Sequence, residues 1–351
     1  MTDFFEGNAF GLRPEELDET QRTAIAAAQA EANARPPRLQ GPKRQHFLPQ
    51  FYLEGFTRDG LAVVFDRHED EIRLQQPLNT AVIGHFYTML DAEGRKRFEV
   101  EEMLCEFEGK AKIGIDKLIA GADELNEEER SDLAIFLSLA ANRTPDMVNS
   151  LQHINGEMVK QMAKMMFTDE ESTFQDLRND EKHADETDEE LRAQAQFMVN
   201  MSKNNGFEIE TDEKWAVSMA IKVALEAAPY LAGRHWRVVH RTSEKHSFVT
   251  CDAPVYLTSV NPRPSFYGVG FGSPDAFMAF PLHQSCVLEM FGNDGGLTHA
   301  KADRDRMRMV NLHLARRCQR FVVGRDAALV KSLTDELGLA KTKWKPKFRV
   351  N

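Results

Sequence analysis

The sequence has little cysteine and no long apolar run, and both absences limit what the protein can be. Its four cysteines, Cys105, Cys251, Cys286 and Cys318, lie far apart and form no CxxC pair. In a chain of 351 residues this pattern is typical of reduced thiols in a cytoplasm and argues against a disulfide framework or a zinc site. No apolar segment reaches the roughly 18 residues that a membrane helix needs, and residues 1–6 lack the layout of a secretion signal. The sequence therefore predicts a cytoplasmic protein with no membrane partner.

Several catalytic motifs are also missing. The sequence contains no GxSxG elbow, and the glycines of residues 268–272 lack the strand–turn–helix frame and the lysine of a phosphate-binding loop. His235, His240 and His246 do not fit a metal site, because the first two would point to opposite faces of a strand and the third begins the next strand. Any activity must therefore depend on residues that lie far apart in the sequence.

The net charge of −11 hides an uneven distribution. Residues 166–215 hold 15 acidic and 5 basic side chains, whereas residues 301–351 hold 5 acidic and 14 basic ones. The overall sign argues against indiscriminate coating of nucleic acid, yet the basic C-terminal segment can meet phosphates locally. Each segment is also a candidate surface for a protein partner. We favour the simpler interpretation, in which the two segments are solvated or face each other.

The periodicity predicts an α+β fold, with a helical middle region bracketed by antiparallel strands. The expected strands alternate or are rich in β-branched and aromatic residues, and they cover residues 61–66, 71–75, 85–89, 236–240, 247–251, 277–282, 286–291 and 320–324. Residues 236–240 and 247–251 flank a polar turn and are expected to form a hairpin. The expected helices cover residues 98–120, 127–142, 146–166, 189–203, 212–231 and 301–319. Asn126 is a suitable N-cap and Gly121 a suitable stop.

Composition shifts suggest the domain boundaries. Residues 1–43 are polar and broken by prolines, which predicts a flexible N-terminal arm with one weak helix. Residues 44–325 are expected to form a single α+β domain. Within it, residues 166–190 are acidic and poor in apolar side chains, as in a loop or insertion. Residues 326–351 are expected to form a C-terminal helix and a basic tail.

Several short motifs follow one another along the chain. The most specific is the opening motif, His46-Phe47-Leu48-Pro49-Gln50-Phe51-Tyr52-Leu53 followed by Phe56. The later motifs are Val64-Phe65-Asp66, Phe86-Tyr87, Glu108, Arg143-Thr144-Pro145, the segment 248–254, Asn311 and Arg320-Phe321-Val322-Val323. Taken in order, these motifs resemble the bacterial proteins grouped as domain-of-unknown-function family 4238. The resemblance covers about residues 44–324 and implies no biochemical activity. Cys251 departs from it, because a serine is expected there, and this change weakens a hydrogen bond.

Arg143 is the strongest physical anomaly in the sequence. It follows Phe136 by seven residues and Ala140 by three, so it continues the apolar stripe of its helix. A guanidinium in that position needs a carboxylate or a phosphate, since an unpaired buried charge costs several kcal/mol. Arg143 either clamps an anionic substrate or pairs with an internal acid and fixes the helix end. We favour the internal pair.

Glu108 lies on the shoulder of the core face of its helix. It is a candidate partner for Arg143, metal ligand or general base, and the simpler alternative is a surface pair with Lys112 four residues on. Glu108 and Lys110 also match the last two residues of a common nuclease motif. That motif requires a strand, but the apolar residues around Glu108 repeat at helical spacing.

Asp252 and His46 complete the predicted site. Asp252 ends a strand, where ligand carboxylates often lie, although an ordinary turn residue is equally expected there. His46 precedes a helix start and can act as a base or ligand, while such a histidine more often binds a loop carbonyl. Asp66 is a weaker candidate at the end of its own strand.

These residues lead to two hypotheses. The first is a hydrolase for phosphate esters such as nucleic acid, with His46 as base or ligand, Asp252 and Glu108 as carboxylates for water or a divalent metal, and Arg143 as phosphate clamp. The second is a non-enzymatic interaction module in which the polar cluster is structural and the charged segments bind a protein.

Overall fold

The computed structural model describes residues 37–204, 206–261 and 268–339. Most of the expected N-terminal arm and the basic tail from residue 340 lie outside these ranges. The chain divides into two compact units, which we describe separately. Of the described residues, those from 37 to 146 and from 217 to 339 belong to unit 1, and those from 147 to 216 belong to unit 2.

A five-stranded sheet forms the centre of unit 1, in the order β12-β7-β11-β10-β9. The strands are β7 (His235–Arg241), β9 (Tyr256–Ser259), β10 (Ala276–His283), β11 (Cys286–Phe291) and β12 (Leu297–Ala302). Neighbouring strands are antiparallel except β12, which runs parallel to β7. The two strands expected at residues 277–282 and 286–291 are confirmed as the β10–β11 hairpin.

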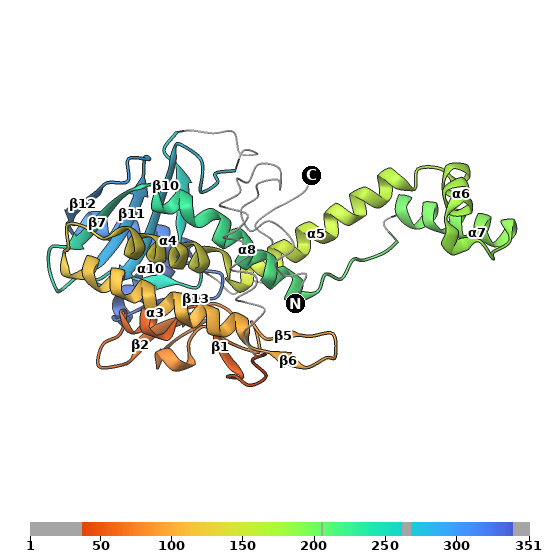
Figure 1. Ribbon diagram of the computed structural model, residues 1–351. Coiled ribbons are helices and arrows are strands. Elements are labelled where there is room, and N and C mark those ends of the chain that lie inside the picture. The colour runs from red at the N-terminus through yellow and green to blue at the C-terminus, as the bar shows by residue number, and fades with distance from the viewer. Residues whose placement is uncertain (1–36, 205, 262–267, 340–351) are drawn as a thin grey trace. The chain divides into compact units, whose positions relative to one another are not determined.

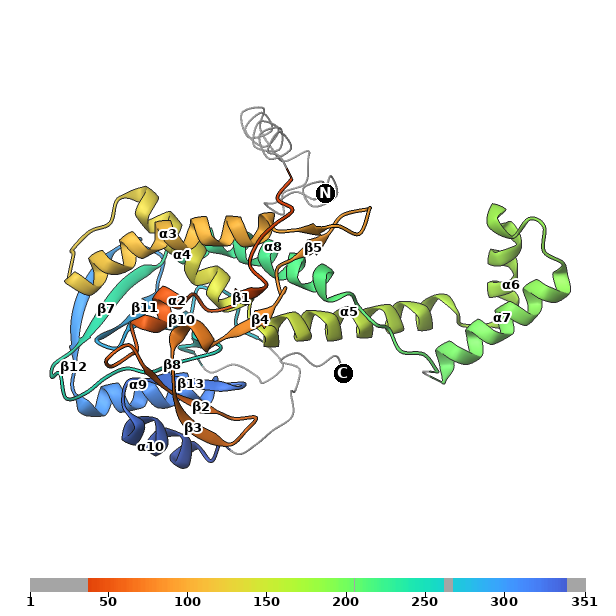
Figure 2. The same cartoon turned by 90° about the horizontal axis from the view of Figure 1, so that it is seen from below.

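Helices cover both faces of this sheet, as Figures 1 and 2 show. They are α3 (Glu99–Ala120) and α4 (Glu127–Asn142) on one face and α9 (Arg304–Arg316) on the other. Phe136 of α4 packs edge-on against Phe280 of β10 with ring centroids 6.0 Å apart. On the opposite face, Leu314 of α9 packs in one cluster with Val239 of β7. The α+β fold predicted from the sequence is therefore present, with the sheet between two helical layers.

A second sheet in unit 1 has the order β3-β2-β13-β8. Its strands are β2 (Ala62–Asp66), β3 (Glu71–Gln75), β8 (Thr250–Cys251) and β13 (Phe321–Gly324), and α10 (Ala327–Leu337) packs on it. The expected hairpin between residues 236–240 and 247–251 is wrong, because β8 pairs with β13 instead. The Asn311 side chain binds the backbone of Ser247 and Val249, which holds this segment against α9 and away from β7.

Residues 44–97 contribute several short elements to unit 1 besides β2 and β3. These are β1 (Arg44–His46), α2 (Gln50–Glu54), η3 (Pro77–Asn79), β4 (Val82–Gly84), β5 (Met89–Leu90) and β6 (Lys96–Arg97). β1 pairs with β4 and places His46 opposite Val82. The strand expected at residues 85–89 is wrong for most of its length. His85 has a φ of 56°, which is left-handed backbone, and its carbonyl accepts the N–H of Thr88 to close a turn.

Unit 2 is helical. Its elements are most of α5 (Pro145–Met166), α6 (Glu170–Asn179), η4 (Glu181–His183), α7 (Asp188–Lys203) and the start of α8 (Glu213–Ala232). The loop expected at residues 166–190 is wrong in part, because α6 occupies its middle. Asp169 caps α6 by accepting the N–H of Ser172, and Phe174 packs with Leu191 of α7. None of the helices in the described part of the chain is long and apolar enough to cross a membrane.

Candidate functional site

Arg143 ends α4 with its side chain inside unit 1. The capping box of Asn126 and Glu129 fixes the start of α4, and the apolar stripe then turns its last residues inward. The Arg143 side chain is only 1% exposed, and its Nη2 donates to Oε1 of Glu108 at 2.5 Å. Glu108 therefore pairs with the buried guanidinium and not with Lys112, which binds Asp116 instead.

This ion pair leaves the guanidinium incompletely bonded. Nε and Nη1 of Arg143 are buried and have no hydrogen-bond partner among the described residues. The Tyr87 ring lies 5.9 Å from the guanidinium, and its hydroxyl donates to the Arg143 carbonyl at 3.4 Å. Burial lowers the pKa of Arg143, but the charges of Glu108, Tyr87 and Glu101 outweigh it, so the net pKa is raised. Arg143 is thus a permanent cation with hydrogen-bonding capacity to spare.

Glu101 is a member of this cluster that sequence reasoning missed. It lies on α3 seven residues before Glu108, which is two helical turns and places both on one face. Burial raises the pKa of Glu101 to about 7, with the charge of Glu108 adding to the shift and that of Arg143 opposing it. The seven-residue spacing of Glu101 and Glu108 is the sequence feature that could have identified Glu101 as a member of the cluster. A carboxyl with this pKa exchanges its proton near neutral pH.

His46 faces the same group of charges from the end of β1. Its Nε2 is buried, and no group that the structure describes forms a hydrogen bond with it. Burial lowers the pKa of His46, while the carbonyls of Leu78 and Pro77 and the charge of Glu108 act in the opposite direction. The imidazole is therefore neutral at pH 7 and can accept a proton. Of the four predicted residues, Glu108 and Arg143 form an ion pair, and His46 is close enough for the charge of Glu108 to act on it.

Asp252 lies elsewhere. Its carboxylate accepts the backbone N–H groups of Gln319 at 3.0 Å and Arg320 at 2.7 Å, just before β13. Burial raises its pKa to about 6, the backbone amides oppose this, and the charge of Asp146 adds to it. Among the described residues, no hydrogen bond or ion pair joins Asp252 to His46, Glu108 or Arg143. Asp252 holds two strands in place in unit 1.

The comparisons with known proteins identify a family. Residues 44–328 match the family described as "Protein of unknown function (DUF4238)", which is most of the chain. The chain belongs to the DUF4238 family. A search of curated proteins and a search of solved structures returned no significant match. The resemblance of the opening motif is thereby confirmed, and the chemistry of this DUF4238 protein has to be argued from its own residues.

Cys251, where the DUF4238 pattern suggests a serine, still makes a hydrogen bond. Its Sγ donates to the Ala253 carbonyl at 3.2 Å, and the side chain is buried in the core cluster beneath β8. A thiol is a weaker hydrogen-bond donor than the hydroxyl expected at this position, so the bond to Ala253 is a weak one.

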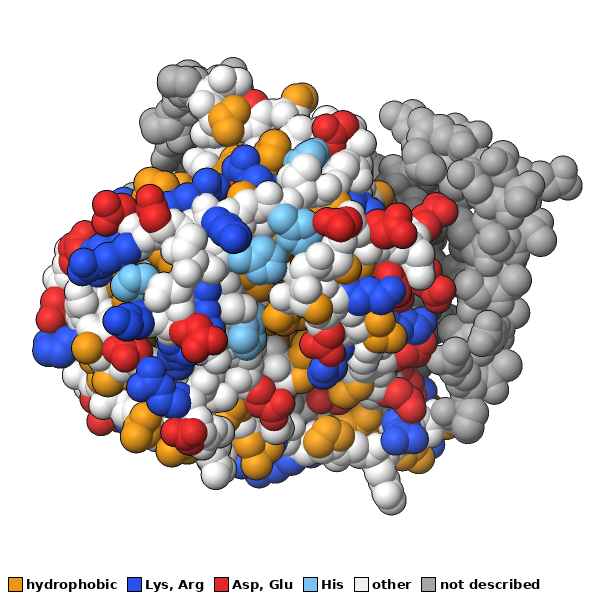
Figure 3. Space-filling view, turned by 90° about the vertical axis from the view of Figure 1, so that its left-hand side faces the viewer, with side chains coloured by type: hydrophobic (Ala, Val, Ile, Leu, Met, Phe, Trp, Pro, Cys, Tyr) orange, Lys and Arg blue, Asp and Glu red, His pale blue; other side chains and the backbone are white. Residues whose placement is uncertain are grey.

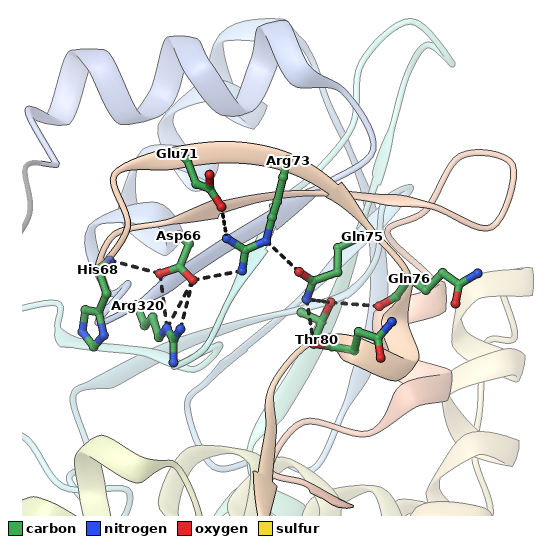
Figure 4. A network of polar contacts seen from close by, with 9 residues as sticks. Asp66, His68, Glu71, Arg73, Gln75, Gln76, Thr80 and Arg320 are labelled. Atoms are coloured by element: carbon green, nitrogen blue, oxygen red, sulfur yellow. Dashed lines mark hydrogen bonds and ion pairs between the residues drawn. The ribbon is translucent and has the colours of Figure 1, made fainter.

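Asp66 forms the other charged centre of the DUF4238 fold (Figure 4). The carboxylate is fully buried at the end of β2 and accepts from the N–H of His68 and from the guanidinium groups of Arg73 and Arg320. Burial raises its pKa, but the bonds from Arg320 and Arg73 outweigh this and lower the net value. Both carboxylate oxygens are satisfied, as expected for a structural centre.

No metal centre is evident in the described ranges. No group of three or more His, Cys, Asp or Glu side chains is arranged there to hold a metal ion. The histidines that the sequence singled out bind other groups: His235 contacts Asp294 and Thr298, and His240 stacks on His299.

Proposed function

We propose that this DUF4238 protein is a hydrolase whose site combines His46, Glu101, Glu108 and Arg143. The observation that carries the proposal is a buried guanidinium with two nitrogens that bind no described group, in one electrostatic cluster with a neutral imidazole and a carboxyl of pKa about 7. Groups with shifted pKa values cluster at catalytic sites more often than elsewhere. We further expect a bacterial, cytoplasmic protein, from the family resemblance and the unpaired cysteines.

Each residue has a role in the proposed reaction. His46 takes a proton from the attacking water, and Glu101 gives a proton to the leaving oxygen. Arg143 holds Glu108 in place and stabilises the negative charge that develops on the reacting group. Glu108 is 19% exposed and marks the edge at which solvent reaches the cluster. Glu101 and Glu108 would also be the carboxylates available to a divalent cation brought by the substrate.

Phosphate esters are the substrate class that fits a fixed cation beside an acid–base pair. On the face of the protein in Figure 3, acidic and basic side chains are interspersed, so this face offers no continuous basic track for a phosphate backbone. Asp252 is not part of the proposed reaction.

The test is a panel of phosphodiesters and phosphomonoesters, with DNA and RNA, assayed with Mg²⁺, Mn²⁺ or a chelator. His46→Ala and Glu101→Gln should each reduce turnover by about 10²-fold or more. Glu102→Gln is the matched control, because Glu102 neighbours Glu101 but forms a half-exposed ion pair with Arg38. Equal activity in all four proteins would show that a contaminating enzyme is responsible and would refute the proposal.

One observation favours the interaction module as a second candidate. In unit 2, five large apolar side chains are each more than half exposed: Met158, Met162, Met165, Met166 and Phe197. The four methionines recur along α5, and flexible methionine surfaces are common where helices dock. Because residues 166–215 carry 15 acidic and 5 basic side chains, the expected partner is a basic amphipathic helix.

A synthetic helix of leucine and lysine tests this candidate by fluorescence titration. Met162→Glu should weaken binding, although it adds a charge that attracts the peptide. Gln161→Glu is the matched control, because it adds the same charge at an exposed neighbour and leaves the apolar surface intact. Equal binding by both variants would mean that the methionines do not form the docking surface.

A further inference from the structure

A second polar cluster lies on the face of the five-stranded sheet that α9 covers. Arg237 of β7 lies opposite Glu289 of β11, and Glu289 lies opposite Ala279 of β10. Ala279 in turn lies opposite Tyr256 of β9. These four residues therefore form one row across four strands. Ala279, the smallest, leaves a hollow between the carboxylate on one side and the aromatic ring on the other.

Helix α9 supplies the opposite wall. Arg306, Met309, Val310, His313 and Leu314 recur at helical spacing, so one face of α9 looks onto the row. The rings of His313 and Tyr256 lie 4.8 Å apart and close one end. Together the two walls line a half-open cavity of about 540 Å³, a size suited to a small organic molecule.

Glu289 carries a buried charge at the other end of the cavity. Its side chain is 4% exposed, and it accepts from Nε and Nη2 of Arg237 at 2.8 and 2.5 Å and from Nη2 of Arg306 at 2.8 and 3.0 Å. Two guanidinium groups thus share one carboxylate, which leaves one positive charge. Burial and the charge of Arg316 lower the pKa of His313, so the imidazole adds no charge at neutral pH.

Both arginines have donors left over. Each is 34% exposed and lines the cavity, and neither Nη1 of Arg237 nor Nε and Nη1 of Arg306 binds another described group. Phe277, Ala279, Met309, Val310 and Leu314 give the cavity apolar walls. The cavity therefore combines a single excess positive charge at one end with an apolar body and an aromatic end.

We propose that this cavity binds a small organic acid, with its carboxylate on Arg237 and Arg306 and its apolar or aromatic body against Phe277 and Met309. One excess charge matches a monoanion, and planar guanidinium groups suit a carboxylate. A phosphate dianion would leave a charge uncompensated and would gain nothing from the apolar walls. The inference does not depend on the proposed hydrolytic site.

Benzoate is the probe, and the ¹³C-labelled methyl group of Met309 is the reporter, assigned from its loss in Met309→Leu. Titration to about 20 mM is needed, because ligands of this size bind in the millimolar range. The Met309 signal should shift with benzoate, and the neutral isostere benzamide should bind about tenfold more weakly. Inorganic phosphate should bind more weakly than benzoate.

Two variants separate the site from the fold. Arg306→Met should weaken benzoate binding about tenfold. In this variant the charge of Arg237 only balances that of Glu289, so no excess positive charge is left for the ligand. Arg308→Met is the matched control on the same helix, because Arg308 lies outside the cavity and binds Ser332 and Glu336. Ala279→Val should also block binding, by filling the hollow.

Three results would overturn the proposal. The first is a Met309 signal that benzoate does not move in the wild-type protein. The second is equal binding of benzoate and benzamide. The third is unchanged benzoate binding in both Arg306→Met and Ala279→Val. Tighter binding of phosphate than of benzoate would also overturn the proposal, because the cavity would then be a phosphate site and not a site for an organic acid.

Discussion

Asp66 and Arg143 are both buried charges with partners of opposite sign, but they differ in how completely they are bonded. The Asp66 carboxylate has donors on both oxygens, from one backbone amide and two arginines. In the part of the chain that the structure describes, the Arg143 guanidinium has one carboxylate partner, and two of its buried nitrogens have none. A fully bonded buried charge is explained by the fold alone, whereas a partly bonded one calls for a further partner or a function.

The largest effect on stability is expected at the complete centre. Asp66→Ala removes the common acceptor of Arg73 and Arg320 and should lower the free energy of unfolding by about 2–4 kcal/mol, less than for a sealed pair because these arginines are partly exposed. The net pKa of Asp66 lies below that of the unfolded chain, so this stability is present above about pH 4 and is lost as the pH falls. Urea unfolding at several pH values measures both effects.

Glu71→Ala is the control for Asp66. Glu71 also pairs with Arg73, but its side chain is about half exposed, so the loss should stay below about 1 kcal/mol. Similar losses for the two variants would mean that burial does not set the strength of this network.

Arg143→Met should cost less, about 1–2 kcal/mol. The substitution removes a guanidinium whose burial was only partly compensated, and it leaves Glu108 free to turn toward solvent. Turnover on phosphate esters should be lost at the same time, which kinetic assays of the folded variant can show. A loss of stability larger than that of Asp66→Ala, with activity unchanged, would make Arg143 the structural centre and reverse the comparison.

The sequence could predict that Arg143 is buried, because its place in the stripe of α4 is a local property. It could also suggest Glu108 as partner. It could not predict that Glu101 has a pKa near 7, since that value depends on burial by distant segments. The β8–β13 pairing was missed for a similar reason: Asn311, 60 residues further along, holds the segment that the local turn pattern would have paired with β7.

The pH dependence of stability also distinguishes the Asp66 centre from the Arg143 cluster, through Glu101. The folded pKa of Glu101 is about 7, above its ordinary 4.5, so the folded state retains this proton between those values while the unfolded chain loses it. Stability should therefore fall as the pH rises from about 4.5 to about 7, by about 1 kcal/mol after solvent screening, which is opposite in sign to Asp66. Glu101→Gln should remove this fall, and Glu102→Gln should keep it. A Glu101→Gln protein with the wild-type profile would show that Glu101 titrates normally.

The smallest effect is expected at the surface of α3, the helix that also carries Glu101 and Glu108. Lys112 pairs there with Asp116 four residues on, and both side chains are at least half exposed. Lys112→Ala should change the free energy of unfolding by no more than about 0.5 kcal/mol, because such pairs gain little over hydration and are screened by salt. Unfolding at low and high salt measures this. A loss of 1 kcal/mol or more would mean that Lys112 also supports Glu108, and the contrast between a buried centre and a solvated pair on one helix would then fail.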